Sequence, residues 1–115
     1  MAHILIVEDS VDGREALRLL LEGAGHHVSV TGSGEGALAT AAAARPDLIL
    51  IDIGLPGIDG YETARRIRAG DDAVRLVALT GHNRPEDRER SLAAGFDAHF
   101  AKPLDPVRIL TLLDE

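Results

Sequence analysis

The sequence predicts an α/β fold in which a parallel β-sheet carries helices on both faces. Strand-like and helix-like segments alternate regularly along the 115 residues and give five β/α units. Two strand-like segments, His3–Val7 and Leu48–Asp52, are nearly continuous apolar runs, which are typical of strands buried on both faces. This alternation favours a doubly wound parallel sheet, because parallel strands are joined through crossover helices.

After the first strand, apolar residues at helical spacing predict a helix over Val11–Leu21, and Ser10 is a suitable N-cap. The segment His27–Thr31 alternates polar and apolar side chains. We therefore expect a half-exposed edge strand there, with Val28 and Val30 pointing inward.

The remaining elements continue the same alternation. The alanine-rich stretch Gly34–Ala44 is interpreted as a helix packed on the sheet and not as a low-complexity segment, because alanine is the strongest helix former. Beyond the central strand Leu48–Asp52, the expected elements are a helix over Asp59–Ala69, a strand over Val74–Thr80, a polar helix over Arg84–Ala94, a strand over Ala98–Ala101 and a helix over Pro106–Leu113. No linker or repeat separates them, so we expect one domain spanning residues 1–115.

Composition narrows the class of protein. Apolar residues make up 45% of the chain, but there are only one Tyr and two Phe, so the core must be mainly aliphatic. The absence of cysteine excludes disulfides and thiolate metal sites and fits a reducing cytoplasm. The net charge of -7 argues against direct binding of DNA or RNA. Apolar runs are too short to span a bilayer, so we expect a cytoplasmic protein that does not bind membranes.

Chemically capable residues follow the carboxyl ends of four predicted strands. They are Glu8 and Asp9 after the first strand, Asp52 at the end of the third, Thr80 at the end of the fourth, and Lys102 with Pro103 after the fifth. Each alone would commonly be a helix cap or a solvated side chain. Since parallel strands bring their carboxyl ends to one edge of the sheet, we expect these residues to converge on a site.

Phosphoryl transfer to a carboxylate is the chemistry that needs such a set. Asp52 would be the ionised nucleophile, and the neighbouring acids would repel it unless a cation joined them. Mg²⁺, or Mn²⁺, prefers oxygen ligands. Asp9 and Asp52 are candidate direct ligands, the backbone carbonyl of Gly54 is a third, and Glu8 could act through a bound water.

Two further residues would contact the phosphoryl oxygens. Lys102 would supply a second positive charge, and Thr80 would offer a hydroxyl donor. The histidines give no second metal site by spacing alone. His26 and His27 are adjacent at a strand start and are interpreted as solvated, while His3 has no partner at metal-ligand spacing.

Four motifs carry a family resemblance. They are Ile-Val-Glu-Asp at 6–9, the block Asp-Ile-Gly-Leu-Pro-Gly-Ile-Asp-Gly at 52–60, Ala-Leu-Thr-Gly at 78–81 and Phe-Ala-Lys-Pro at 100–103. Together they resemble the receiver domain of two-component response regulators, over essentially the whole chain. The resemblance implies a flavodoxin-like fold with strand order 2-1-3-4-5.

The resemblance also implies roles. Asp52 would accept a phosphoryl group from the phosphohistidine of a histidine kinase or histidine phosphotransfer protein, in a Mg²⁺-dependent reaction. Thr80 would report phosphorylation together with the residue at position 99, where the family usually has an aromatic side chain and this chain has His99. The peptide between Lys102 and Pro103 would be cis.

We therefore expect a phosphorylation-controlled signalling domain that switches a partner-binding surface. It would not be an enzyme, apart from slow self-catalysed phosphotransfer and dephosphorylation. The output partner is not identified by the sequence, and a free-standing regulator, a longer regulator and a hybrid kinase all remain open. Two alternatives are a Mg²⁺-dependent aspartyl-phosphate phosphatase and a pseudo-receiver that is never phosphorylated. Phosphatases of that kind usually carry a second Asp where this chain has Gly54.

Overall fold

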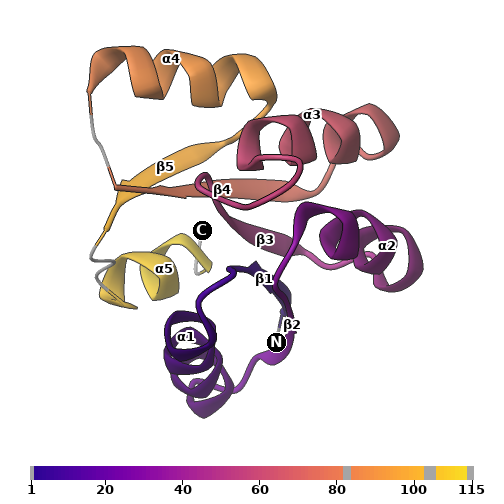
Figure 1. The fold of residues 1–115 in the computed structure, drawn as a ribbon. Coiled ribbons are helices and arrows are strands. Elements are labelled where there is room, and N and C mark those ends of the chain that lie inside the picture. The colour runs from indigo at the N-terminus through magenta and orange to yellow at the C-terminus, as the bar shows by residue number, and fades with distance from the viewer. Residues whose placement is uncertain (1, 82–83, 103–105, 114–115) are drawn as a thin grey trace.

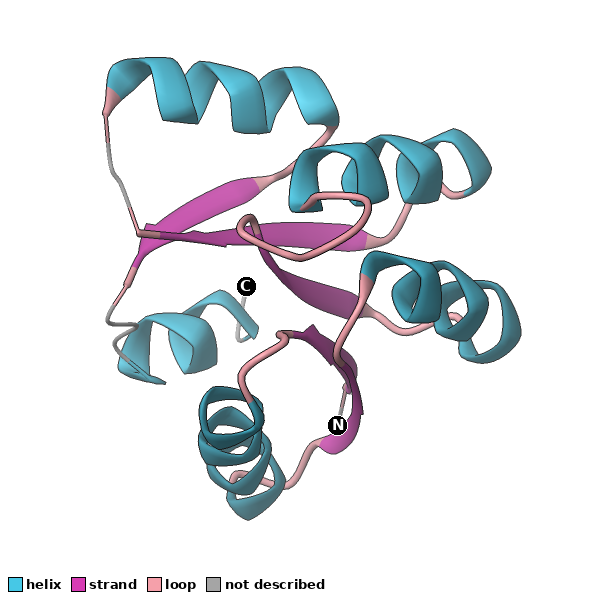
Figure 2. Ribbon diagram, in the orientation of Figure 1, coloured by secondary structure: helices cyan, strands magenta, loops and turns pink. Residues whose placement is uncertain are grey.

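The strands form one parallel sheet, as the computed structural model shows for residues 2–81, 84–102 and 106–113 (Figures 1 and 2). The elements in chain order are β1 (His3–Val7), α1 (Val11–Gly23), β2 (His27–Thr31), α2 (Gly34–Ala44), β3 (Leu48–Asp52), α3 (Gly60–Gly70), β4 (Arg75–Thr80), α4 (Pro85–Ala94), β5 (Ala98–Ala101) and α5 (Pro106–Leu113). The strand order is β2-β1-β3-β4-β5, with every pairing parallel. The predicted flavodoxin-like doubly wound fold and its strand order are thus confirmed.

Helices cover both faces of the sheet. Helices α1 and α5 lie on one face, and α2, α3 and α4 lie on the other (Figure 1). Each face has its own apolar core, and Ile4–Val7 of β1 and Leu48–Ile51 of β3 are almost completely buried between the two. Burial on both faces explains why these strands are continuous apolar runs. Within the described part of the chain, no helix is long and apolar enough to cross a membrane.

Cap residues set where the helices begin. The side chain of Ser10 accepts a hydrogen bond from the N–H of Gly13 at the start of α1, as predicted. Asp59 caps α3 in the same way, so this helix begins at Gly60, one residue later than expected. Other predicted boundaries differ from the observed ones by at most two residues.

Strand β2 is an edge strand, as predicted, but only one of its two valines is buried. Val28 is 8% exposed and belongs to the core beneath α1 and α5, whereas Val30 is 37% exposed. No further strand pairs with the outer side of β2 among the described residues. Val30 lies on the same face of β2 as Val28 but stays partly exposed, because a side chain on an edge strand is covered from fewer directions.

Helix α2 is a packed helix, as predicted from its alanine content. Ala37 is fully buried, and Leu38 and Ala41 pack against the same core. Gly34, the first residue of α2, lies directly against Thr63 of α3 and Ile58 of the preceding loop. A methyl group at Gly34 would overlap Thr63 Oγ1 and lie 2.6 Å from Ile58 Cγ1. Small side chains therefore let α2 approach α3 closely.

We predict that Gly34→Ala destabilises the fold by about 1–3 kcal/mol, because the added methyl group overpacks a fully buried contact with Thr63. The measurement is the free energy of unfolding in urea. The matched control is Gly70→Ala at the end of α3, where a methyl group would meet nothing within 4 Å. Equal stability of the two variants would contradict the packing argument.

Candidate functional site

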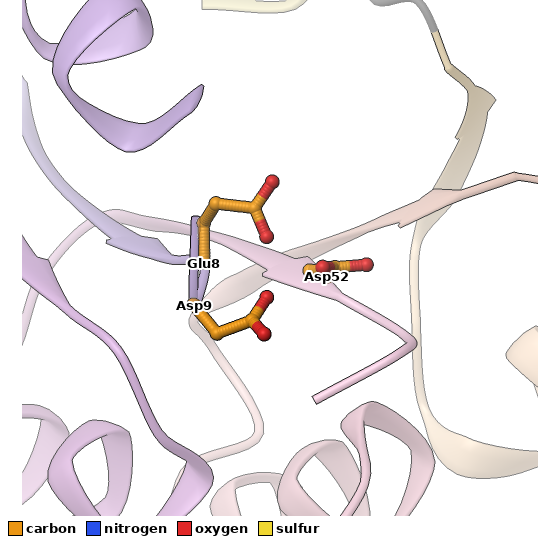
Figure 3. Close-up of side chains that lie close together, drawn as sticks. All are labelled: Glu8, Asp9 and Asp52. Atoms are coloured by element: carbon orange, nitrogen blue, oxygen red, sulfur yellow. The ribbon is translucent and has the colours of Figure 1, made fainter. Parts of the chain in front are cut away.

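The carboxyl ends of β1 and β3 bring three acidic side chains together. Val7 pairs with Ile51 in the register between these strands, so the next residues, Glu8 and Asp52, lie side by side at the carboxyl edge of the sheet. In Figure 3, the side chains of Glu8 and Asp9 follow the end of β1 and extend toward Asp52. One ligand oxygen from each residue lies within 4.8 Å of the others. The predicted convergence of these acids is what the structure shows.

Lys102 joins this cluster from the end of β5. Its Nζ donates to Glu8 Oε1 at 3.0 Å and lies 3.2 Å from Asp52 Oδ2. The N–H of Gly54 donates to the other oxygen, Asp52 Oδ1, at 3.1 Å. Glu8 and Asp52 are 6% and 7% exposed, whereas Asp9 is exposed. The site is thus a partly buried pair of acids with one exposed acid at its rim and one cation beside it.

The protonation states follow from this geometry. Burial raises the pKa of Glu8 to about 7 from its ordinary 4.5, and a proton shared with Asp52 contributes to the shift. Burial alone would also raise the pKa of Asp52, but hydrogen bonds from Glu8 and Gly54, together with Lys102, outweigh it and hold this pKa below its ordinary value. Burial opposes the charge of Lys102, but the two carboxylates raise its pKa. Of the two buried acids, Asp52 is therefore the one that stays ionised at neutral pH.

The donor set fits a hard divalent cation. All three acids offer carboxylate oxygens, which are the ligands that such ions prefer. In addition, Glu8 Oε2 is buried and accepts no hydrogen bond from any described residue. A buried carboxylate oxygen without a donor is costly, and a cation or its bound water would satisfy it. The acidic cluster could therefore bind a metal ion, as the sequence predicted.

Thr80 and His99 lie on strands next to this cluster. Thr80 ends β4, is 5% exposed, and its backbone oxygen accepts from the N–H of Lys102 at 2.7 Å. His99 is half-buried in β5 and pairs with Ala78, two residues before Thr80. The two-residue period places His99 and Thr80 on the same face of the sheet. His99 Nδ1 is 3.1 Å from Ser91 Oγ of α4. The predicted cis peptide lies outside the described residues, because Pro103 is not among them.

Two contacts at the site were not foreseen from the sequence. Arg14 of α1 donates from its guanidinium to the backbone oxygen of Glu8 at 3.3 Å and so supports the turn that carries Asp9. Glu35 of α2 accepts from the N–H of Ile58 at 3.4 Å, in the loop that follows Asp52. Neither residue carries a spacing signal, because each acts across a long sequence separation or on a backbone atom.

The fold and the site together define an α/β domain with an acidic, lysine-bearing site at the carboxyl edge of its sheet. The sequence profile of the response regulator receiver domain family matches residues 4–114. The chain therefore belongs to the response regulator receiver domain family.

Curated relatives agree with this membership. The transcriptional regulatory protein AfsQ1 of Streptomyces coelicolor is 41% identical over 104 residues, which cover 90% of this chain and 46% of AfsQ1. The DNA-binding response regulator MtrA of Mycobacterium tuberculosis is 36% identical over 108 residues, which cover 94% of this chain and 47% of MtrA. The chain thus spans about half the length of these two regulators.

Solved structures agree as well. The chemotaxis protein CheY4 of Vibrio cholerae matches with a TM-score of 0.93 and 31% identity, over 99% of this chain and 97% of that one. The signal receiver domain of a signal transduction histidine kinase from Syntrophus aciditrophicus matches with a TM-score of 0.88 and 33% identity, over 99% of this chain and 88% of that one. A chemotaxis protein and the receiver domain of a histidine kinase therefore share this fold.

We predict that Glu8 makes the metal-free protein less stable as the pH rises from about 4.5 to about 7. Folded Glu8 keeps its proton to a higher pH than unfolded Glu8, so the folded state binds more protons in this window and the free energy of unfolding falls. Glu8→Gln should flatten this dependence and be more stable than the wild type at pH 8.

The measurement is urea unfolding in the presence of a chelator at pH 5 and pH 8. Glu89→Gln, a change at an exposed glutamate of α4, is the control and should keep the wild-type pH dependence. A Glu8→Gln protein with the same pH dependence as wild type would contradict the assigned burial effect.

Proposed function

We propose that this domain accepts a phosphoryl group from a phosphohistidine onto Asp52 and that phosphorylation switches a surface read by a partner. The observation that carries the proposal is the convergence of Asp52 with two further acids and with Lys102 Nζ, 3.2 Å away. Membership of the receiver family supports the same reaction. The donor would be a histidine kinase or a histidine phosphotransfer protein.

In this reaction a carboxylate oxygen of Asp52 attacks the phosphorus atom. A P–O bond forms as the P–N bond breaks, and the bonding electron pair leaves with the imidazole of the donor. Asp52 is suited to the nucleophilic role because its lowered pKa keeps it ionised. The N–H of Gly54 holds one of its oxygens and so fixes the orientation of the carboxylate.

Lys102 would balance the charge that arrives with the phosphoryl group. Its Nζ already lies between Glu8 and Asp52, and a short movement would exchange a carboxylate for a phosphoryl oxygen. Thr80, at the end of the neighbouring strand, would donate its hydroxyl to another phosphoryl oxygen.

Mg²⁺ is the cation that we assign to the acidic cluster, with Mn²⁺ as a substitute. Asp9, Asp52 and the carbonyl of Gly54 would hold it, and Glu8 would bind one of its waters. Bound there, it would neutralise repulsion between the acids and the incoming phosphoryl group. Support comes from the three convergent carboxylates and from the buried Glu8 oxygen that has no donor among the described residues.

The switch would run from Thr80 to His99 along one face of the sheet. Phosphorylation draws the Thr80 hydroxyl toward Asp52 and so changes the space available to His99. His99 lies on the neighbouring strand β5, opposite Ala78, which is two residues before Thr80. His99 would then exchange its contact with Ser91 for a more inward position. Because Ser91 belongs to α4, this exchange would alter the surface formed by α4 and β5.

The setting of the domain follows from its relatives by analogy. AfsQ1 is named a transcriptional regulatory protein and MtrA a DNA-binding response regulator, and both are about twice as long as this chain. We propose that this domain likewise controls an output that lies outside it and does not itself bind DNA. The net charge of -7 supports this proposal, because an acidic domain is repelled by the phosphates of DNA.

We predict that acetyl phosphate with Mg²⁺ modifies the wild type at a single site and that Asp52→Asn abolishes the modification, because an amide is not a nucleophile for this transfer. Intact-mass spectrometry gives the readout, and a chelator should also prevent the reaction. Asp72→Asn, a change at an exposed aspartate in the α3–β4 loop, is the control and should be modified normally. Equal modification of Asp52→Asn would overturn the assignment. Turnover of a generic phosphomonoester by the wild type should be negligible.

We predict that His99→Ala leaves phosphorylation intact but reduces the response of α4 and β5 to it. The readout is the set of backbone chemical-shift changes on adding beryllium fluoride and Mg²⁺, which should shrink in these elements and persist around Asp52. Ser91→Ala removes the hydroxyl that contacts His99 Nδ1 and should change the starting state in the same elements. Wild-type responses of α4 and β5 in His99→Ala would remove His99 from the switch.

A further inference from the structure

A pair of histidines lies at the amino-terminal edge of the sheet, at the opposite end of the strands from Asp52. His3 is the first residue of β1 and His27 is the first residue of β2, and the two are direct partners in the parallel register. Their ring centroids are 4.6 Å apart, with 39° between the ring planes. These residues are 24 positions apart in the sequence, so only the fold makes them neighbours.

We propose that His3 and His27 form a binding site for a transition-metal dication such as Zn²⁺. Zn–N bonds of about 2.0–2.1 Å place the centres of two ligating imidazoles roughly 4.5–6 Å apart, depending on the angle at the metal. The observed 4.6 Å lies within this range. His27 is exposed, so its ring can rotate to open the angle without disturbing the core.

A side-chain contact holds the His3 ring in place. His3 Nε2 is 2.8 Å from the hydroxyl oxygen of Ser29, which lies two residues further along β2 than His27. When Nε2 carries the proton and donates it to Ser29, the lone pair is on Nδ1, where it can ligate. An outer hydrogen bond on the second ring nitrogen is the usual way in which proteins fix a metal-binding histidine. Among the described residues, no hydrogen bond engages the ring of His27.

The remaining ligands would be water. Within the described ranges, the only group of three or more histidines or acids within metal-binding distance is the acidic cluster at the other edge. A site with two protein ligands and exchangeable water is open, and we expect reversible binding. Asp47, whose Oδ2 accepts from the N–H of His3 at 2.8 Å, adds negative charge close to the pair.

The two sites differ in chemistry as well as in position. Imidazole nitrogen suits Zn²⁺, Ni²⁺ and Cu²⁺, whereas a set of carboxylates suits Mg²⁺ and Mn²⁺. Millimolar Mg²⁺ should therefore leave the histidine pair free while it occupies the acidic cluster. A metal bound by both rings would fasten the edge strand β2 to β1 and stabilise the folded state by mass action.

The test is calorimetric titration of Zn²⁺ into the 115-residue chain at neutral pH with excess Mg²⁺ present. Wild type should bind one Zn²⁺. His27→Gln should bind Zn²⁺ at least about tenfold more weakly, because one of the two protein ligands is lost. His26→Gln is the matched control. The neighbouring His26 uses its Nδ1 to accept the N–H of Ala2 and is no part of the pair, so this variant should bind as wild type.

Asp9→Asn separates this site from the acidic cluster and should also bind Zn²⁺ as wild type. Wild-type affinity in His27→Gln, or loss of binding in Asp9→Asn, would overturn the proposal. Ring resonances of His3 and His27 should both shift on Zn²⁺ addition, and a shift of only one would exclude the shared site. None of these outcomes depends on whether Asp52 accepts a phosphoryl group.

Discussion

Repulsion among Glu8, Asp9 and Asp52 is the constraint on which the functional edge of this domain depends. Carboxylate oxygens within 4.8 Å of one another repel by roughly 3 kcal/mol per ionised pair at an effective dielectric constant of about 20. Two or three such terms are comparable with the whole stability of a small domain, which is about 5–15 kcal/mol. The molecule therefore needs positive charge or protons at this point. Lys102 supplies one charge, and burial raises the pKa of Glu8 to about 7, so this acid keeps its proton to a higher pH than an exposed glutamate does.

The charge of Lys102 and the raised pKa of Glu8 explain why the site is prepared for ligands. A dication would replace the proton on Glu8 and release Lys102 from part of its contact with the acids. Lys102 would then be available to an incoming anion, which is the property that a phosphoryl acceptor needs. The hydrogen bond from Lys102 to Glu8, which joins residues 94 positions apart, is on this view the resting form of a charge arrangement that ligands complete.

The sequence predicted most of the fold because its strongest signals are local. The apolar runs of β1 and β3 allow only doubly buried strands, and Ser10 and Asp59 mark helix starts through their own side chains. Strand order came from the family resemblance and not from periodicity. The meeting of Lys102 with Glu8 was expected from the shared edge of parallel strands, whereas the His3–His27 pair escaped prediction because it depends on register and on side-chain direction across strands. The exposure of Val30 escaped for a related reason, since it depends on what lies beyond the edge of the sheet.

Polar residues at both ends of the central strands also determine the register itself. An apolar run that is buried on both faces gives little penalty for a one-residue slip, because each face would still receive an apolar side chain. In β1, however, the apolar run lies between His3 and Glu8. In β3 the apolar run lies between Asp47 and Asp52. A slip would draw a charged or polar side chain between the two cores, at a cost of several kcal/mol if it remained unpaired. The acids that we assign to phosphoryl transfer therefore also hold the strands in the alignment that brings them together.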